Sequence, residues 1–245
     1  MMSIIIPALN EEQGIFNLLE HLVVQAGDPE ELEIIVVDGG SIDETLLEIK
    51  RFTLAYTYID VKTVDSDKGR GLQLHNGAKS AIHDIFYFLH ADSYPPKGYD
   101  KQVYKAVAAG KPAGCFRMRF RSWHWWLLII GWFSRFSWKV SRGGDQSQYI
   151  TRNLYEQIGG YDTTVPIYED YLLINKLYEL QKYHVIQKWL TTSARRYQEV
   201  GVLRLQWFYL TIYWKKRQGA SIDEIYEYYL KWCDVSEKSV ESVSE

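Results

Sequence analysis

Acidic side chains follow two apolar segments of the sequence, at the points where buried strands would end. Asp92 comes shortly after residues 86–89, and Asp38 closes residues 33–37. The carboxyl ends of parallel strands meet at one edge of a sheet, where ligands bind and where a carboxylate can hold a hard divalent cation against a phosphate. The alternative for Asp92 is a structural one: it could cap the turn that the Pro95-Pro96 pair begins.

Two further charged pairs could complete a reaction at such an edge. Glu169-Asp170 begins a predicted helix, and a carboxylate within hydrogen-bond reach can take a proton from an attacking hydroxyl. Arg195-Arg196 follows a predicted strand, and arginine donors stabilise the charge of a departing phosphate. The acidic pair also has a structural explanation, because acids are favoured in the first turn of a helix.

Alternating strands and helices would position these side chains. Strands are expected at residues 4–7, 33–37, 61–64 and 86–89, with helices between them. Short links between such units imply a mostly parallel sheet covered on both faces. We expect Asn10 to cap the first helix and residues 41–44 to form a capping box for the second, which extends through Phe52.

The pattern changes in the second half of the chain. Residues 116–121 alternate apolar side chains with arginines, which is typical of a strand wet on one face and favours an antiparallel or edge position. A last strand at 185–191 and two aromatic helices at 203–217 and 221–233 follow. The residues from 235 onward are mostly Ser, Glu and Val, and we expect them to be frayed.

The bulk composition excludes several classes of protein. The chain has 245 residues and a net charge of -3, which gives no general reason to expect nucleic acid as a partner. Cys115 and Cys233 are too few for a disulfide scaffold or a four-ligand zinc site, so a reducing compartment is expected. The first apolar run is too short for a secretory signal and lacks a basic leader, which predicts a cytoplasmic location.

Five of the nine tryptophans lie between Trp123 and Trp138. The uninterrupted apolar part, residues 125–133, is much shorter than the ~20 residues that span a bilayer, so this segment is not expected to cross a membrane. Arg117, Arg119, Arg121 and Arg135 lie nearby. One interpretation is a helix that lies on the inner face of the membrane and meets anionic lipid. The other is an aromatic helix packed into the core or into a homodimer.

In combination, five stretches resemble the family 2 glycosyltransferases, which have the GT-A fold. They are residues 3–12, 36–43, 68–71, 88–92 and 169–170. The sequence is most similar to a bacterial subgroup marked by His-Ala-Asp, Gly-Asp-Gln and Ser-Ala-Arg-Arg, which begin here at His90, Gly144 and Ser193. The resemblance covers roughly residues 3 to 200 and has its motifs in the order typical of the family.

The resemblance implies a division of the chain. It predicts an α/β GT-A fold with a mixed, mostly parallel central sheet flanked by helices. Residues 1–93 would form the nucleotide-sugar-binding half and residues 94–198 the acceptor-binding half of one domain. Residues 199–234 would form a C-terminal helical extension, and residues 235–245 a flexible tail.

The resemblance also implies roles for particular residues. Asp170 would be the general base, with Glu169 beside it. Asp92 would hold Mn²⁺ or Mg²⁺ on the donor diphosphate. Arg195 and Arg196 would lie near the leaving diphosphate, and Asp145 and Gln146 near the acceptor. The nucleotide pocket would be formed by Pro7, Ala8, Asn10, Glu11, Asp38, Lys68, Arg70 and Ala91.

Two departures from the family pattern bear on the metal. His90 stands where many relatives have a first metal-binding aspartate, and Gly39 replaces a second acid after Asp38. Fewer carboxylates give weaker intrinsic affinity, so the metal is expected to bind together with the nucleotide. His90 could be a ligand or could orient Asp92, and both interpretations are open.

The function implied is an inverting, metal-dependent transfer of one sugar from a UDP- or GDP-linked donor to an acceptor hydroxyl, with a lipid-like acceptor as one option. Processive polymer synthesis is disfavoured, because a full Gln-X-X-Arg-Trp signature is missing. One alternative is a sugar-phosphate nucleotidyltransferase, although residues 7–12 lack the glycine-rich loop usual in such enzymes. The other is a non-catalytic protein that binds a membrane surface.

Overall fold

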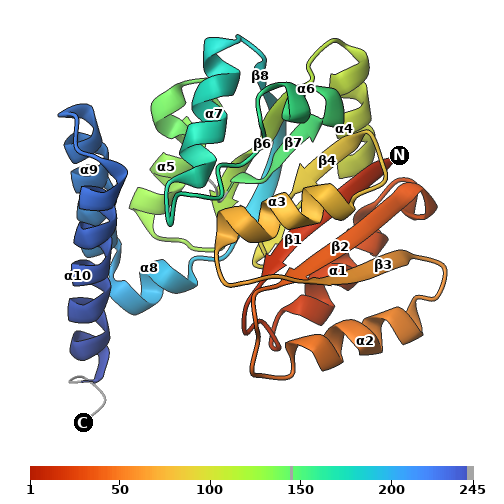
Figure 1. Cartoon of the computed structure of the whole chain (residues 1–245), viewed down its shortest axis with the longest axis horizontal. Helices are drawn as coiled ribbons and strands as arrows, with labels where there is room; N and C mark the ends of the chain where they lie inside the picture. Colours follow the sequence, from red (N-terminus) through yellow and green to blue (C-terminus); the bar gives the residue numbers. More distant parts are fainter. Residues whose placement is uncertain (144–145, 242–245) are drawn as a thin grey trace.

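A single sheet of eight strands forms the centre of the molecule (Figure 1), in the order β3-β2-β1-β4-β7-β6-β8-β5. The computed structural model describes residues 1–143 and 146–241. Strands β3, β2, β1 and β4 are parallel, β7 is antiparallel to β4 and β6, β8 is parallel to β6, and β5 is antiparallel to β8. The strands are β1 Met2–Ala8, β2 Leu32–Asp38, β3 Asp60–Asp65, β4 Ile85–Phe88, β5 Ser93–Tyr94, β6 Ala113–Phe120, β7 Gln148–Thr151 and β8 Tyr183–Thr192.

Helices cover both faces of this sheet (Figure 1). One face packs against α1, α2 and α4, and the other against α3, α6 and α7. The helices are α1 Ile15–Gln25, α2 Thr45–Ala55, α3 Arg70–Ser80, α4 Tyr99–Ala108, α5 Trp125–Phe133, α6 Arg152–Gln157, α7 Glu169–Glu179, α8 Arg195–Val200, α9 Val202–Arg217 and α10 Ile222–Glu241. Two 3₁₀ turns span Pro29–Glu31 and Lys139–Ser141.

The first strand shows why β1, β2 and β4 are largely apolar, in contrast to β3. Ile4 and Ile6 enter the core on one face of the sheet, while Ile5 enters the core on the other. Because both faces are covered, successive side chains are all buried and no polar alternation remains. The predicted strand-helix alternation and parallel sheet are confirmed in this half of the chain.

Strand β6 lies inside the sheet, between β7 and β8. Its antiparallel pairing with β7 involves only Ala113 and Gly114, whereas the alternating residues 116–120 pair in parallel with β8. The expected antiparallel pairing is therefore wrong for the alternating segment. Within the described residues, β8 is the only strand that pairs with this segment, which agrees with the edge alternative. The alternation has another cause: the Arg117 guanidinium lies 3.9 Å from the centre of the Trp189 ring. An aromatic ring therefore covers part of the face that the arginines suggested was open to water.

The predicted helix starts are wrong in the first two strand-helix units. Helix α1 begins at Ile15 and α2 at Thr45, so Asn10 caps neither. The Asn10 side-chain oxygen accepts a hydrogen bond from the backbone amide of Ile42 at 3.0 Å. The backbone amide of Asn10 donates to the Ser41 hydroxyl at 2.9 Å. These short polar side chains tie two loops to each other instead of capping the helices that follow.

The last two helices form a pair at one side of the molecule, reached through α8 (Figure 1). They share an apolar cluster with β6 and α5, in which Leu127, Leu205 and Phe208 are buried. Helix α5 contributes little else to the interior, because only Leu127 and Gly131 are buried along it. The expectation that this tryptophan-rich helix packs into the core is therefore wrong for most of its side chains. Within the described residues, every helix is too short or too polar to cross a bilayer.

Candidate active site

The carboxyl ends of the parallel strands meet at one edge of the sheet, as predicted. Asp38, the last residue of β2, is in register with Ala8 at the end of β1. Phe88 ends β4 in register with Ile5 of β1, and the Leu89 amide donates to the Ile5 carbonyl at 3.0 Å. Asp38 and the segment that carries Asp92 therefore emerge on the same side.

A small cavity of about 140 Å³ lies at this edge. It brings together four of the predicted site residues, Glu11, Ala91, Asp92 and Arg195. The other residues that line it are Gly14, Tyr94, Arg121 and Ser193. Loops from both halves of the chain thus build one polar pocket from two carboxylates and two guanidinium groups.

Hydrogen bonds fix the loop that carries Asp92. The His90 carbonyl accepts from the Ser93 amide at 3.1 Å, and the Asp92 carbonyl accepts from the Ser193 amide at 3.2 Å. The His90 side chain is not among the residues that line the cavity. The main chain of His90 therefore helps to close the turn that carries Asp92. This contact is relevant to the expectation that His90 orients Asp92.

The pKa of the Glu11 carboxyl is shifted in this pocket. Burial raises the pKa of its carboxyl, the nearby Asp92 carboxylate raises the pKa further, and the Arg195 guanidinium opposes both. Arg195 Nη2 lies 3.4 Å from Glu11 Oε1. The Glu11 and Asp92 carboxylates repel each other, and a bound cation would relieve that repulsion.

This donor set fits a divalent cation that binds with a diphosphate. Among the described residues, no group of three or more His, Cys, Asp or Glu side chains is arranged to hold a metal. Magnesium-like ions commonly use one or two protein carboxylates and take their remaining ligands from phosphate and water. Asp92 and Glu11 match that pattern, so the residues present are compatible with the expected metal.

Asp38 is bound by its own loop. One carboxylate oxygen accepts from the Gly40 and Ser41 amides at 3.1 and 3.0 Å, and the other accepts from the Ser41 hydroxyl at 2.5 Å. The Glu11 amide in turn donates to the Thr45 hydroxyl at 2.8 Å. These bonds tie the loops after β1 and β2 together around Asp38, which is buried and does not line the cavity.

Gln73 on α3 holds the two strand ends together, and sequence reasoning missed it. Its side-chain amide donates to the Ala8 and Val37 carbonyls at 2.9 and 2.8 Å. A Cβ on Gly39 would lie only 2.9 Å from the same amide, so any larger residue there would require the Gln73 side chain to shift. The available signal was a polar residue beside Leu74, Gly77 and Ala78 on the buried face of this helix.

Arg70 lies against the two acids of α7. Its Nε is 2.5 Å from Glu169 Oε1, and its Nη2 is 3.1 Å from Asp170 Oδ2. The Tyr161 hydroxyl donates to Asp170 Oδ1 at 3.2 Å. Asp170, the predicted general base, is thus buried and in contact with Arg70. Arg70 was itself predicted to approach the nucleotide.

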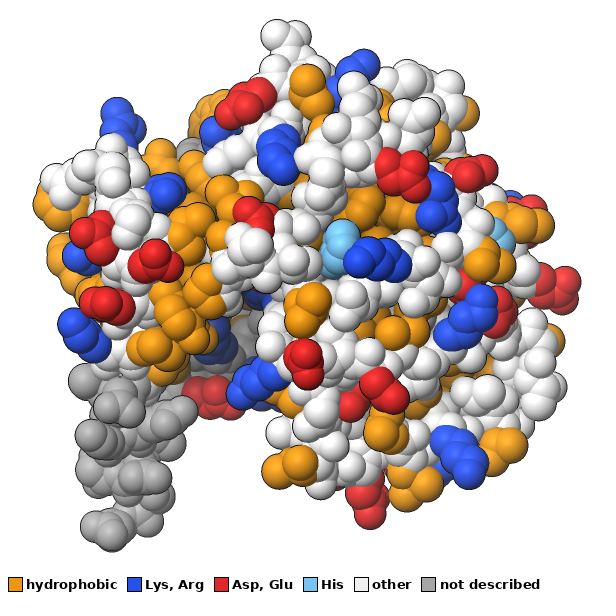
Figure 2. Space-filling model, viewed as in Figure 1, with side chains coloured by type: hydrophobic (Ala, Val, Ile, Leu, Met, Phe, Trp, Pro, Cys, Tyr) orange, Lys and Arg blue, Asp and Glu red, His pale blue; other side chains and the backbone are white. Residues whose placement is uncertain are grey.

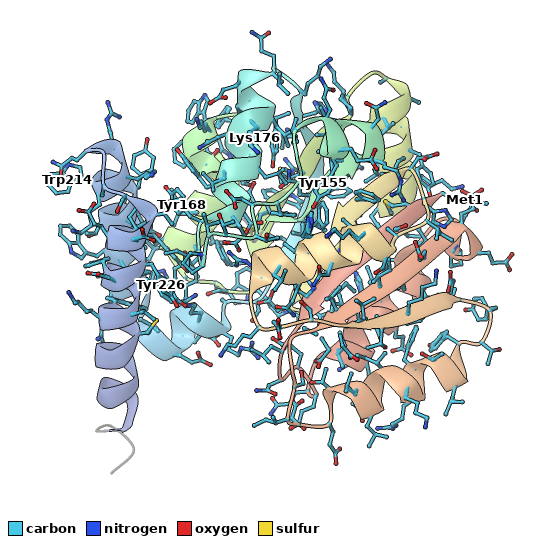
Figure 3. All side chains as sticks on the ribbon, viewed as in Figure 1. Met1, Tyr155, Tyr168, Lys176, Trp214 and Tyr226 are labelled. Atoms are coloured by element: carbon cyan, nitrogen blue, oxygen red, sulfur yellow. The ribbon has the colours of Figure 1, made fainter. Side chains whose placement is uncertain are left out.

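Aromatic packing places this acidic pair at the same edge of the sheet. The Tyr161 ring lies 5.0 Å from the ring of Phe88, the last residue of β4. Tyr155 of α6, labelled in Figure 3, packs against both rings. Asp170 is therefore connected through Tyr161 to the strand that leads into Asp92.

The structure places three other predicted residues as follows. Pro7 lies within β1, and Ala8 ends it with its carbonyl accepting from Gly39 and Gln73. Lys68 is exposed in the segment before α3. None of these side chains lines the cavity that contains Asp92.

Arg196 does not lie with Arg195, contrary to the prediction. Its guanidinium lies 6.0 Å from the centre of the Trp232 ring on α10. Burial would lower the pKa of Arg196, but Tyr209 and Tyr229 outweigh it and raise that pKa. Neighbouring residues of a helix point in different directions, so only Arg195 reaches the pocket.

Gln146 is buried and hydrogen-bonded within its own loop, which argues against its predicted contact with the acceptor. Its side-chain oxygen accepts from Arg142 at 2.7 Å, and its side-chain nitrogen donates to the Ser141 carbonyl at 2.6 Å. Arg142 also donates to the Ser134 and Phe136 carbonyls at 2.6 and 2.7 Å. Asp145, the other predicted acceptor contact, lies outside the described residues.

Solved structures share the fold of this chain. A mannosyltransferase, PcManGT from Pyrobaculum calidifontis, in complex with GDP-Man and Mn²⁺ superposes with a TM-score of 0.62 at 21% identity, covering 78% of this chain and 56% of that protein. TarS 1-349 from S. aureus in complex with UDP-GlcNAc gives a TM-score of 0.62 at 19% identity, covering 78% and 58%. The predicted GT-A fold is confirmed.

Sequence comparisons point the same way. The probable glycosyltransferase YdaM of Bacillus subtilis is 29% identical over 206 residues, which are 75% of this chain and 47% of that protein. A dolichyl N-acetyl-alpha-D-glucosaminyl phosphate 3-beta-D-2,3-diacetamido-2,3-dideoxy-beta-D-glucuronosyltransferase of Methanococcus voltae is 32% identical over 114 residues, or 45% of this chain and 36% of that protein. The chain thus spans less than half the length of either relative.

The family assignment rests on more than half of the chain. The sequence model described as glycosyl transferase family 2 matches residues 3–165, which include the strand ends, the loop of Asp92 and Tyr161. The expected family is confirmed by this match. The chain belongs to glycosyl transferase family 2.

Proposed function

We propose that the chain transfers one sugar, with inversion, from a UDP- or GDP-linked donor to an acceptor hydroxyl in the presence of Mn²⁺ or Mg²⁺. The observation that carries this proposal is the pocket in which Glu11, Asp92 and Arg195 meet beside the end of β2. Cation ligands and anion donors in one cavity suit a nucleoside diphosphate. The donors of the two solved neighbours are consistent with this choice.

Asp92, with Glu11 beside it, would hold the cation, which when bound would neutralise charge on the departing diphosphate. Arg195 and Arg121 line the same cavity and supply hydrogen-bond donors to that group. Such preorganised donors matter most where negative charge grows as the bond to the sugar breaks. Asp38 and the linked loops after β1 and β2 would then orient the nucleoside.

Asp170 would accept the proton of the attacking hydroxyl. Asp170 contacts Arg70 and Tyr161, so its charge is partly satisfied. A diphosphate close to α3 would compete for Arg70 and release the carboxylate for the acceptor. Attack from the face opposite the leaving group inverts the anomeric carbon, and no covalent sugar intermediate is required.

A lipid-linked hydroxyl is the acceptor class that we favour. The Methanococcus voltae relative is named for a dolichyl phosphate substrate. The half that would bind the acceptor, residues 94–198, also has several exposed apolar side chains among those described, including Trp125 and Trp132. The acceptor assignment is a proposal for this chain and depends on the sugar-transfer activity itself.

A panel of labelled sugar nucleotides tests the activity directly. The protein is incubated with each UDP- or GDP-sugar and an alkyl glycoside acceptor, with Mn²⁺, with Mg²⁺ or with chelator. We expect a glycosylated product and free nucleoside diphosphate from one donor, both metal-dependent, with inverted configuration by NMR. Formation of a sugar nucleotide from a nucleoside triphosphate and a sugar phosphate would instead show a nucleotidyltransferase. Turnover in neither assay would favour a non-catalytic protein.

A further inference from the structure

Helix α5 exposes one continuous apolar stripe. Five large side chains are exposed along it, at spacings that place them on one face of the helix. They are Trp125, Leu128, Ile129, Trp132 and Phe133. The opposite face is the one that packs on β6, where Gly131 would meet the Met118 carbonyl if it carried a Cβ. Exposed apolar residues that are scattered singly need no explanation, but a whole helix face does.

Helix α9 has a second apolar stripe that faces solvent. Leu203, Trp207, Leu210 and Trp214 recur at helical spacing and are all exposed, with Leu203 and Trp207 each 72% exposed. Its inner face buries Leu205 and Phe208. A helix that is apolar on all sides is normally covered on all sides. In Figure 3, Trp214 lies on the side of the helix pair turned away from the sheet.

The two stripes begin next to each other. A cavity of about 510 Å³ lies between the start of α5 and the start of α9. Ser122, His124 and Leu127 line one side, and Val202, Leu203 and Arg204 line the other. Trp123, which is 95% exposed, stands beside it. Arg121, which lines the donor pocket, directly precedes Ser122, so this apolar surface adjoins the proposed active site.

Both segments are basic although the chain is acidic overall. Residues 117–143 contain six Lys or Arg, and residues 202–217 contain four, while neither segment contains Asp or Glu. The net charge of the whole chain is -3. Of the basic side chains, Arg142 is buried, Arg117 packs on the Trp189 ring and Arg121 lines the donor pocket. Arg135 is exposed and lies 5.2 Å from the centre of the exposed Trp132 ring. Tryptophan beside a cation is typical of the headgroup zone of a membrane.

The neighbouring helix α10 provides a contrast. Asp223, Glu224 and Glu227 are exposed on it, and Leu230 is its only large apolar side chain that is exposed among those described. In Figure 2, apolar side chains gather over the helix pair and between that pair and α7, with acidic side chains on the same face of the pair. The described part of α10 therefore lacks the combination of apolar and purely basic character that the segments of α5 and α9 have.

We propose that α5 and α9 form a docking surface for an anionic lipid bilayer, which goes beyond the sugar-transfer activity. The apolar stripes would lie in the headgroup zone, and the basic side chains would meet lipid phosphates. A symmetric homodimer through the same surface is disfavoured, because it would bring two purely basic surfaces together. The docked chain would hold its donor pocket beside the lipid surface.

Flotation of the full chain with vesicles tests this proposal. The vesicles contain either phosphatidylcholine alone or phosphatidylcholine with phosphatidylglycerol. The test variant is Leu203→Ser/Trp207→Ser, and the matched control is Leu54→Ser/Tyr58→Ser, in which Leu54 is 70% and Tyr58 55% exposed on the far side of the sheet. All four side chains are exposed, so neither variant should disturb folding, and circular dichroism confirms this.

We expect the wild-type chain and the control to float with the anionic vesicles, less so as salt is raised. The Leu203→Ser/Trp207→Ser variant should partition about tenfold more weakly or worse, because its apolar contact with the lipid is lost. Flotation that is equal for both variants, or equally strong on neutral vesicles, would overturn the proposal. So would a wild-type dimer that this variant dissociates, without any vesicle binding.

Discussion

In the proposed donor site, Asp92 and Glu11 are two ordinary carboxylates that would bind a metal only together with the nucleotide. Each carboxylate alone would be a solvated surface acid, and together they are held in a half-buried pocket by Arg195 and by main-chain hydrogen bonds. Their mutual repulsion contributes to the raised pKa of Glu11. The diphosphate would bring the remaining ligands, so cation and donor are expected to bind together.

Substitution of Asp170 tests the proposed base. Asp170→Asn should not weaken the affinity for the nucleoside diphosphate, because Arg70 then loses a competing partner. It should slow sugar transfer by about 100-fold to 10,000-fold, because the amide cannot take the proton. Single-turnover transfer and calorimetric binding would separate the two effects. The matched control, Asp223→Asn on the exposed face of α10, should retain full turnover. An Asp170→Asn enzyme as fast as the wild type would remove this residue from the mechanism.

The pKa of Glu11 predicts a pH dependence. Because that pKa is raised above 4.5, mainly by burial, the carboxyl takes up a proton at a higher pH than an ordinary glutamate does. The gain in nucleotide affinity caused by Mn²⁺ should therefore be full at neutral pH and should begin to fall above pH 4.5 as the pH is lowered. Glu11→Gln should lack this dependence.

The wild type and Glu11→Gln are compared by the ratio of their nucleotide affinities with Mn²⁺. Protonation of the nucleotide affects both proteins equally, so a change of this ratio with pH reports on the Glu11 carboxyl alone. Calorimetric titration across the acid range gives that ratio. A ratio that stays constant with pH would show that Glu11 does not contribute to the cation site.

Helix α3 is the element that links the nucleotide half to the catalytic acids. Its first residue, Arg70, contacts Glu169 and Asp170, and Gln73 one turn later binds the ends of β1 and β2. Gly77, one turn further along, allows the helix to approach the sheet, because a Cβ there would lie 2.4 Å from Ile5 Cγ2 and 2.8 Å from Val37 Cγ2. Close packing of this helix thus sets the positions of both groups.

A methyl group at Gly77 should therefore destabilise the fold. Gly77→Ala is expected to lower the free energy of unfolding by roughly 1–3 kcal/mol, because the two branched side chains below it have little room to move. Gly143→Ala is the control, since nothing lies within 4 Å of a Cβ there and its φ is not positive. Chemical denaturation measures both. Equal stability of the two variants would show that α3 can shift outward without cost.

Sequence patterns predicted elements better than they predicted where helices begin. The strands at residues 4–7, 33–37 and 86–89 were recognisable because burial on both faces leaves a run of apolar residues. Asn10 and Ser41 were misassigned as caps because their hydrogen bonds cross between loops that are distant in sequence. The pairing of β6 with β8 likewise depends on tertiary contacts that period-2 alternation does not encode.

Across the whole molecule, some of the predicted site residues lie together in one pocket and others lie elsewhere. Glu11, Asp92 and Arg195 could be brought together by motif and strand order alone. Arg196 and Gln146 were predicted to lie at the site, but the structure places them elsewhere. Arg196 points toward Trp232 from its helix, and the buried Arg142 binds the side chain of Gln146. Gln73 and Tyr94 were missed because their roles depend on packing across the sheet edge.

The opposite end of the sheet contains a buried charge that should govern acid stability. Burial by itself would raise the pKa of Glu33, but hydrogen bonds from Lys62, the Ser3 hydroxyl and the Ile82 amide outweigh it and hold that pKa below its ordinary value. A lowered pKa means that the folded state favours the charged form. Its contribution to stability is present above pH 4.5 and is lost as the pH falls through the lower, folded-state pKa.

Glu33→Gln should accordingly be less stable than the wild type at neutral pH, by roughly 1–3 kcal/mol, since a buried charge-assisted network is left partly unsatisfied. The difference in stability between Glu33→Gln and the wild type should shrink as the pH is lowered through the folded-state pKa of Glu33. Urea titrations at several pH values would follow this difference. A difference that persists unchanged in acid would mean that the charge of Glu33 is not the cause.

Calorimetric titration of UDP and GDP, with Mn²⁺ and with chelator, into the wild type and Asp92→Ala tests the central claim most directly. The wild type should bind one of the nucleotides tightly only with the cation, and Asp92→Ala should lose at least about tenfold of that affinity while its fold is retained. Metal-dependent binding of equal strength by both proteins would contradict the assignment of this pocket as the donor site.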